Sequence, residues 1–512
     1  MSSQYVFIVL LRRPYHSSYI RIERSAACSK HGLAPPELHL PASPCPELLL
    51  TNSVPPDVQV NEIHSFIGSA KAKIFILDDQ IAQAQRTLVR RRLKSQRAEL
   101  KGLVKSHCGV VSTIRRLPGE VLGEIFSQYL GARDSRLHMH SPKALSHLVG
   151  VCARWRAIAL ASPLLWRHIR PITRKGKNWN DSEELQQISL QLQRSAPVAL
   201  SIHLDETAPS RVVDLLLTES RRWQNINLDF YSSYIKNLAT SKVEFPALEK
   251  VTLDIWGLLP SLHKMALFLK SLPAMVDFKL VVGRAPIPRT LDIIWAQLRT
   301  CTLTECCTTD ILPILALFSA GTRVCLEEFF EGEEQLTSVH TVVSGLSINC
   351  HNQRAIDILL NSLTAPCLKK FRISGCSISI PPITAFFDRS SCALTHLGIV
   401  ALYDRSADVL TLLSSSHVRD IVDLDVDLQS DCRVLWKLTE MLAARDIMII
   451  PNLRTLALRD CNWINEAVVN MFEIQSNRRP VLRSLWLNSL ALLPQDTLQA
   501  LKSGGLEVVM FE

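Results

Sequence analysis

The sequence predicts an α/β fold in which a set of N-terminal helices precedes a long array of alternating strands and helices. Three observations carry this prediction. They are a seven-residue apolar period over residues 62–110, two short amphipathic stretches within residues 112–170, and a strand motif that recurs through residues 184–512. The chain has 512 residues, of which 47% are hydrophobic and 21% charged. It is therefore long enough for two or more domains and too apolar for wholesale disorder.

The composition also indicates the cellular compartment in which the protein works. No apolar run approaches the roughly 20 residues that span a bilayer, and the apolar stretch from Tyr5 to Leu11 is followed by Arg12 and Arg13 instead of a cleavage site. The 14 cysteines lack paired spacing, which favours buried free thiols in a reducing compartment. We therefore expect a cytoplasmic or nuclear protein without membrane association. The net charge of +9 is too mild to require a nucleic-acid partner.

Residues 1–61 are predicted to form a disordered, proline-rich region. Proline lacks a backbone N–H donor and fixes φ, so a dense run of prolines favours extended chain. The prolines of this run are Pro35, Pro36, Pro41, Pro44, Pro46, Pro55 and Pro56.

Residues 62–110 are predicted to form a basic coiled-coil helix. One seam position is apolar every seven residues, and a second is small or apolar. The seam residues are Ile67, Ile74, Ile81 and Leu88, with Ala70, Leu77 and Ala84 between them. Arg91 and Ser95 then interrupt the seam. So short a seam leaves two arrangements open, which are pairing with a second copy and packing back on the same chain.

The polar face of this helix is strongly basic. Its side chains are Arg86, Arg90, Arg91, Arg92, Lys94, Arg97, Lys101 and Lys105, against Glu99. Such a run indicates either a nuclear-import or nucleic-acid-binding patch or an ordinary solvated face, and we favour the solvated face.

Residues 112–170 are predicted to form a small helical unit. Pro118 occupies a first helical position, where its missing N–H costs nothing, and Glu120 suits the positive end of the helix dipole. An apolar stripe follows at helical spacing, made of Val121, Leu122, Ile125, Phe126, Tyr129 and Leu130. A unit of this size is more apolar than it can bury alone, so we expect a partner to cover its surplus surface.

This unit resembles the F-box. The matching residues are Leu117, Pro118, Glu120, Val121, Leu122, Ile125, Phe126, Cys152, Trp155, Arg156 and the run from Ser162 to Trp166. With the basic helix before it, the unit looks like F-box proteins common in mushroom-forming fungi. The resemblance implies docking onto the Skp adaptor of a cullin-RING ubiquitin ligase. It implies a docking surface of Leu117, Pro118, Val121, Leu122, Ile125 and Phe126, and an internal core that includes Cys152, Trp155 and Trp166.

A strand motif recurs along residues 184–512. Its clearest copies begin at Pro246, Pro366, Pro451 and Pro480, and each places apolar residues in an L-x-x-L-x-L pattern. The copies resemble leucine-rich repeats, which implies a degenerate, curved solenoid with its strands on the concave side. Residues 310–343 break the rhythm. An unrelated α/β domain with coincidental leucine spacing is the alternative.

Alternation along a strand predicts which side chains of a copy face the core. In the copy at Pro451, Leu456 and Leu458 should be buried. The residues expected to be more exposed, near the concave side, are Arg454, Thr455, Ala457 and Arg459.

The side chains between the apolar positions are the candidate client-binding residues. Collected from the better copies, they are Lys250, Thr252, Lys369, Lys370, Arg372, Arg454, Arg483, Ser484 and Trp486. Their balance is cationic, so we expect a client that is acidic or phosphorylated. Arginine and tryptophan are enriched at binding hot spots, which singles out Arg372, Arg454, Arg483 and Trp486. Packing of Trp486 against residues 506–511 is the alternative.

The cysteines of the repeats are predicted to be structural. Cys306, Cys376 and Cys461 each follow the first apolar position of a copy by eight residues, where the resemblance implies a side chain that satisfies backbone groups between coils. Cys301, Cys306 and Cys307 do not have the spacing of a two-pair zinc site. Phosphate-binding glycine loops and the common hydrolase motifs are also missing from the sequence. We therefore expect no enzymatic activity, no metal and no cofactor.

The sequence thus predicts a substrate-recognition subunit of an SCF-type cullin-RING ubiquitin ligase, with the Skp adaptor, the cullin and a protein client as partners. Two alternatives remain. One is a protein-interaction scaffold outside any ligase, and the other is a nucleic-acid-binding protein that uses the basic helix.

Overall fold

The computed structural model describes most of residues 41–510. Gaps in the description fall at residues 86, 133–141, 172–180, 206–207, 230–242, 256–261, 284–286, 288–292, 333–337, 376–378, 402–405, 428–431, 445–448, 460–469, 472–473, 475–481 and 488–494. The chain divides into two compact units, Met1–Trp166 with Arg194–Ala196, and Arg167–Gln193 with Pro197–Glu512. We call them the first and second unit. None of the described helices is both long and apolar enough to cross a bilayer.

The proline-rich region predicted to be disordered lies outside the described residues up to residue 40, and the rest of it contains helix. Helix α1 (Pro46–Leu50) begins with Pro46, and Pro56 is the N-cap residue of α2 (Asp57–Gln83). Both prolines stand where a helix needs no N–H donor, so they start helices instead of extending the chain.

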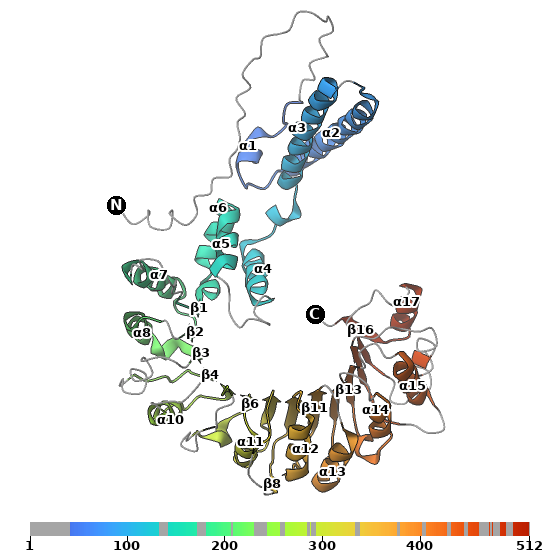
Figure 1. The fold of residues 1–512 in the computed structure, drawn as a ribbon. Helices are drawn as coiled ribbons and strands as arrows, with labels where there is room; N and C mark the ends of the chain where they lie inside the picture. The colour runs from blue at the N-terminus through green and yellow to red at the C-terminus, as the bar shows by residue number, and fades with distance from the viewer. Residues whose placement is uncertain are drawn as a thin grey trace, which may run out of the picture. The chain divides into compact units, whose positions relative to one another are not determined.

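The predicted coiled-coil helix over residues 62–110 is two helices that pack side by side (Figure 1). Helix α2 buries Ile67 and Leu77, and α3 (Thr87–Val110) packs against it through Leu100. Leu88, the last predicted seam residue, is 78% exposed. The interrupted seam therefore pairs with a helix of its own chain, and an Arg97–Asp78 ion pair joins the two helices.

The helical unit predicted over residues 112–170 consists of a 3-10 turn (Thr113–Arg115), α4 (Gly119–Ala132), α5 (Pro142–Val151), α6 (Ala153–Ala161) and a 3-10 turn (Pro163–Trp166). Its core is an apolar cluster built around Leu122, Phe126, Leu130, Leu148, Ala159, Leu165 and Trp166. The rings of Phe126 and Trp155 lie 4.8 Å apart, and the indole Nε1 of Trp166 donates to the carbonyl oxygen of Ala159 at 2.8 Å. Cys152 caps α6 by accepting the Trp155 N–H at 3.4 Å.

The second unit is built on a 14-stranded parallel sheet whose strands follow chain order. They are β1 (His168–Ile169), β2 (Leu200–Leu204), β3 (Trp223–Asp229), β4 (Lys250–Asp254), β5 (Asp277–Val281), β6 (Thr300–Thr304), β7 (Arg323–Glu327), β9 (Gly345–Asn349), β11 (Lys370–Gly375), β12 (His396–Ala401), β13 (Asp423–Asp427), β14 (Thr455–Arg459), β15 (Ser484–Leu487) and β16 (Glu507–Met510). A separate pair joins β8 (Val339–His340) to β10 (Leu363–Thr364).

Helices alternate with these strands. They are α7 (Asp181–Arg194), α8 (Ser210–Leu217), α10 (Leu262–Lys270), α11 (Thr308–Leu315), α12 (Gln353–Ser362), α13 (Ile380–Ser390), α14 (Ser406–Leu413), α15 (Cys432–Ala443) and α17 (Gln495–Ser503). Within this unit the strands line the inner side of an arc and the helices its outer side (Figure 1). The core lies between the two layers.

The register of the sheet is shifted once, between β2 and β3, and is the same from strand to strand after that. Phe371, Leu397, Leu424, Leu456 and Leu485 are partners on consecutive strands, and each is no more than 1% exposed. Because side chains alternate between the two faces of a strand, the residues between these apolar positions share the inner face.

A strand of the sheet, β7, also lies within residues 310–343, where the sequence shows no clean copy of the motif. Val324 and Leu326 of β7 are buried and occupy the second and third apolar positions of the motif, but Gly321 stands where the first leucine belongs. Gly321 has φ of +98°, a backbone conformation that suits glycine. The missing leucine hides the copy from a motif search.

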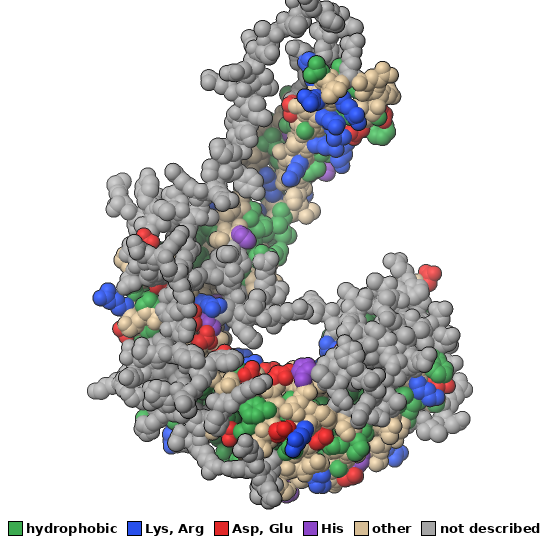
Figure 2. All heavy atoms as spheres, viewed as in Figure 1, with side chains coloured by type: hydrophobic (Ala, Val, Ile, Leu, Met, Phe, Trp, Pro, Cys, Tyr) green, Lys and Arg blue, Asp and Glu red, His purple; other side chains and the backbone are tan. Residues whose placement is uncertain are grey.

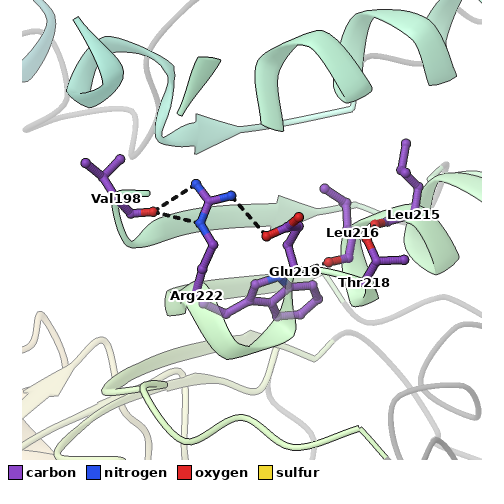
Figure 3. A network of polar contacts seen from close by, with 7 residues as sticks. Val198, Leu215, Leu216, Thr218, Glu219 and Arg222 are labelled. Atoms are coloured by element: carbon purple, nitrogen blue, oxygen red, sulfur yellow. Dashed lines mark hydrogen bonds and ion pairs between the residues drawn. The ribbon is translucent and has the colours of Figure 1, made fainter. Parts of the chain in front are cut away.

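Side-chain hydrogen bonds to backbone carbonyls stabilise the turn after α8 and the segment before β2. The guanidinium of Arg222 donates to the carbonyl oxygen of Val198 at 3.1 and 3.0 Å and to the Glu219 carboxylate at 3.1 Å (Figure 3). Thr218 donates to the carbonyl oxygen of Leu215 at 2.6 Å. These contacts hold the turn after α8 against the segment that leads into β2.

The cysteines contribute in a different pattern from the predicted one. Cys306 donates to the carbonyl oxygen of Thr304 in its own coil at 3.4 Å, while Cys376 and Cys461 lie outside the described residues. Cys350 makes the contact between coils, with Sγ 3.0 Å from the carbonyl oxygen of Phe329. Burial raises the pKa of the Cys301 and Cys306 thiols, which keeps both protonated at neutral pH.

The buried row gives a direct test of the register. Leu456→Ala should lower the free energy of unfolding by roughly 2–5 kcal/mol, because Leu456 is fully buried. Thr455→Ala, one residue earlier on the inner face, should change it by less than about 0.5 kcal/mol. Urea unfolding of both variants measures the difference, and equal losses would contradict the assigned faces.

Candidate functional site

Helix α4 of the first unit presents an apolar stripe to solvent. Val121 is 44% exposed, Ile125 42% and Tyr129 36%. They follow one another at four-residue spacing, which places them on one side of a helix. Pro118, at the start of α4, is also exposed. Four neighbouring residues of this kind form a surface that a partner protein can cover.

The predicted docking set therefore needs correction. Leu122 and Phe126 are fully buried and belong to the core of the unit, while Leu117 is half-buried against that core. The reason is helical geometry, because Leu122, Phe126 and Leu130 form a second stripe one residue out of phase with the exposed one. Of the predicted residues, Pro118, Val121 and Ile125 remain at the surface.

Two arginines hold the beginning of α4 in place. The guanidinium of Arg154 donates to the carbonyl oxygens of Arg115, at 2.6 Å, and Leu117. Arg115 in turn donates to the carbonyl oxygens of Leu48 and Thr51, both at 3.1 Å. The exposed stripe thus projects from a helix that is tied both to α6 and to the segment after α1.

The inner face of the sheet in the second unit carries the other candidate site. A groove of about 530 Å³ crosses the face from β6 to β14. Small residues line part of it, among them Gly345, Ser347, Gly398 and Ala457. Arg323, Lys370, Arg372, His396, Asp423 and Asp425 supply its ionisable groups.

The inner face has mixed charge, so the expectation of a cationic face is wrong. Lys250 pairs with Asp277 at 3.0 Å, and Lys279 pairs with Glu327 at 3.0 Å. Figure 2 shows acidic side chains, in red, gathered on the inner side of the sheet. Asp277 and Glu327 lie on β5 and β7, outside the clearest copies of the motif, and the spacing of the apolar residues on these two strands is the signal that assigns both acids to the inner face.

The candidate client residues do not form one cluster. Arg372 is paired with Asp425. Arg454 and Arg483 are exposed but precede their strands by one residue, which puts them out of phase with the inner rows. Trp486 is half-buried on β15, in register between Ala457 and Val509, and lies four strands from Arg372. Ala457, expected to be more exposed, is only 7% exposed, because larger residues flank it in register.

An ion-pair network spans the C-terminal half of the groove. Arg372 and Arg459 both donate to the carboxylate of Asp425, the latter at 2.8 and 3.1 Å. Gly398 lies in register between Arg372 and Asp425, and a Cβ there would stand 2.9 Å from Cγ of Arg372. Glycine therefore leaves the path along which the arginine side chain reaches across β12.

The network shifts the acid–base properties of its members. Burial raises the pKa of Asp425, but the hydrogen bonds and charges of Arg459 and Arg372 outweigh it and hold the pKa below its usual range. Burial lowers the pKa of His396 and outweighs the raising effect of Asp423, whose Oδ2 lies 2.6 Å away. The His396 ring is therefore neutral near pH 7.

The described residues do not include a group of three or more histidine, cysteine or acidic side chains placed to hold a metal ion. What the groove offers is recognition of a polar, partly charged segment.

Comparison with known proteins gives one informative match. A family model described as F-box-like matches residues 114–171. Curated proteins give no match. Among solved structures, a protein from Bacteroides fragilis aligns with 65% of this chain and 84% of its own at 11% identity and a TM-score of 0.26, a similarity too weak to carry an argument.

The Asp425 network predicts a pH-dependent stability. Asp425→Asn should lower the free energy of unfolding by roughly 1–3 kcal/mol at pH 7, the range for hydrogen bonds to charged groups. Because the folded-state pKa lies below the unfolded value of about 3.9, this stabilisation is present above about pH 4 and is lost as the pH falls through the folded value. The difference between wild type and variant should therefore shrink at pH 3.

Urea unfolding at pH 7 and pH 3 checks this expectation. Asp214→Asn, a change at an exposed carboxylate on α8, serves as the control and should have little effect at either pH. A deficit in Asp425→Asn that stayed constant between the two pH values would contradict the assignment.

Proposed function

We propose that the chain is the substrate-recognition subunit of an SCF-type cullin-RING ubiquitin ligase. In this proposal the F-box-like unit docks the Skp adaptor, which connects it to the cullin. The second unit, a degenerate leucine-rich-repeat solenoid, holds a protein client on its inner face. The chain has no catalytic step of its own and works in the cytoplasm or nucleus.

One observation carries the proposal. The segment that matches the F-box-like family, residues 114–171, is also the segment whose α4 exposes Val121, Ile125 and Tyr129. The exposed stripe supplies an apolar surface, and the F-box resemblance supplies an adaptor that such a surface would bind. The separate repeat unit then leaves a second surface for a client, as a receptor requires.

Docking can be tested on the exposed stripe. Ile125→Asp and Val121→Asp should each abolish capture of the Skp adaptor, because a carboxylate forced into an apolar interface without a partner costs several kcal/mol. Both variants should fold, since the two side chains are more than 40% exposed. The measurement is co-purification of the adaptor and cullin with the tagged full chain.

Phe75→Asp is the matched control, because Phe75 is a large apolar residue that is 70% exposed on α2. It should leave adaptor capture unchanged. Thermal unfolding of all three variants reports folding. Normal adaptor capture by folded Ile125→Asp would contradict the docking surface, and no capture by the wild type would leave a scaffold outside a ligase as the function.

A further inference from the structure

Two basic side chains of the groove stand apart from the others. Arg323 on β7 and Lys370 on β11 are exposed, and neither forms an ion pair with a described residue. The other lysines and arginines of the inner rows are all paired with carboxylates, namely Lys250, Lys279, Arg372 and Arg459. Among the described residues of the groove, the positive charge that is not paired with a carboxylate therefore lies at Arg323 and Lys370.

The register brings these two cations toward a common point. Arg323 and Lys370 are both partners of Gly345 on β9, the strand between them. Two strand spacings put their Cα atoms roughly 10 Å apart, a separation that two long side chains can bridge around one anion. A Cβ at residue 345 would lie 3.0 Å from Cγ and 3.7 Å from Cδ of Arg323, so glycine leaves the path along which the Arg323 side chain runs over β9.

The chemistry of this pair suits an oxyanion. A guanidinium and an ammonium both donate charge-assisted hydrogen bonds to phosphate or carboxylate oxygens. A phosphorylated side chain carries about −1.5 to −2 charge at pH 7 and three acceptor oxygens. It therefore matches two cations better than a single carboxylate does.

Each flank of the pair carries more carboxylates than basic side chains. On β3–β5, Asp229, Asp254 and Asp277 face the same side as Lys250 and Lys279. On β13, the inner-face carboxylates are Asp423, Asp425 and Asp427, and Arg372 and Arg459 are the basic residues that pair with Asp425. A run of acidic residues laid along the face would meet like charge on either side. A nucleic acid, whose phosphates repeat every few ångströms, would meet the same repulsion.

We propose that the groove recognises one phosphorylated side chain in a client segment whose flanking residues are basic. This deepens the function proposed above and rests on it. The phosphate binds between the charged end groups of Arg323 and Lys370, and the acids of β5 and β13 each lie three strand spacings from β9, the strand between the two cations. That is roughly 14 Å, or about four residues of extended chain on either side of the phosphate.

The test uses the full chain and short labelled peptides. The probe has a central phosphoserine, lysines four residues to either side and alanine or glycine elsewhere. Three companions each change one feature: serine in place of phosphoserine, glutamate in place of phosphoserine, and aspartates in place of the lysines. Fluorescence anisotropy should show the probe binding at least tenfold more tightly than each companion.

Variants of the chain locate the binding. Arg323→Glu and Lys370→Glu should each weaken binding of the probe at least tenfold, and the neutral Arg323→Gln and Lys370→Gln provide the same comparison should a charge reversal impair folding. Arg211→Glu, at an exposed site on α8, should bind as the wild type does. Thermal unfolding shows that each variant is folded.

Several results would overturn the inference. Equal binding of the glutamate companion would make the site a carboxylate site, and equal binding of the aspartate companion would remove the role of the flanks. Unchanged binding by folded Arg323→Glu and Lys370→Glu, or no binding of the probe at all, would reject the groove. Adaptor capture is measured separately on the same chain, so its failure would reject the proposed function whatever the peptides do.

Discussion

The second unit depends on one constraint, which is the parallel register that its sheet keeps from β3 to β16. Because Phe371, Leu397 and Leu424 are partners on consecutive strands, each strand turns the same side chains toward the helices. The residues between them then fall into rows along the inner face. A slip of one residue anywhere would exchange the two sets. The register therefore determines the core and the order of charges along the groove together.

In the first unit, too, the position of a residue in the sequence repeat decides whether it is buried or exposed, here with the period of a helix. Helix α4 carries two apolar stripes, one through Phe126 that fills the unit and one through Ile125 that faces solvent. A helix with apolar residues on so much of its circumference needs cover on both sides. The protein supplies one side through α5 and α6. The exposed stripe on α4 therefore indicates that this helical unit binds another protein.

The sequence predicts the parts of the fold that follow from periodicity. Apolar spacing locates the helical unit at residues 112–170 and most strands of the sheet, since these residues must be buried wherever their neighbours lie. It does not reveal the strand β7, because Gly321 replaces a leucine of the motif. It also does not reveal that residues 62–110 form two helices, α2 and α3, because no glycine or proline marks the turn after Gln83. The candidate site is harder still. Whether Arg372 is available depends on Asp425, 53 residues away, and on the glycine between them in register.

The path of Arg372 over Gly398 has a consequence for how this groove can evolve. A side chain at residue 398 would collide with the arginine, so position 398 can gain one only after position 372 has become smaller. Shortening position 372 first leaves Asp425 with Arg459 as its remaining arginine partner. The three sites on β11, β12 and β13 are thus epistatic, and the order in which substitutions arrive decides which are tolerated. Lineages of this fold should change these positions as a set or keep all three.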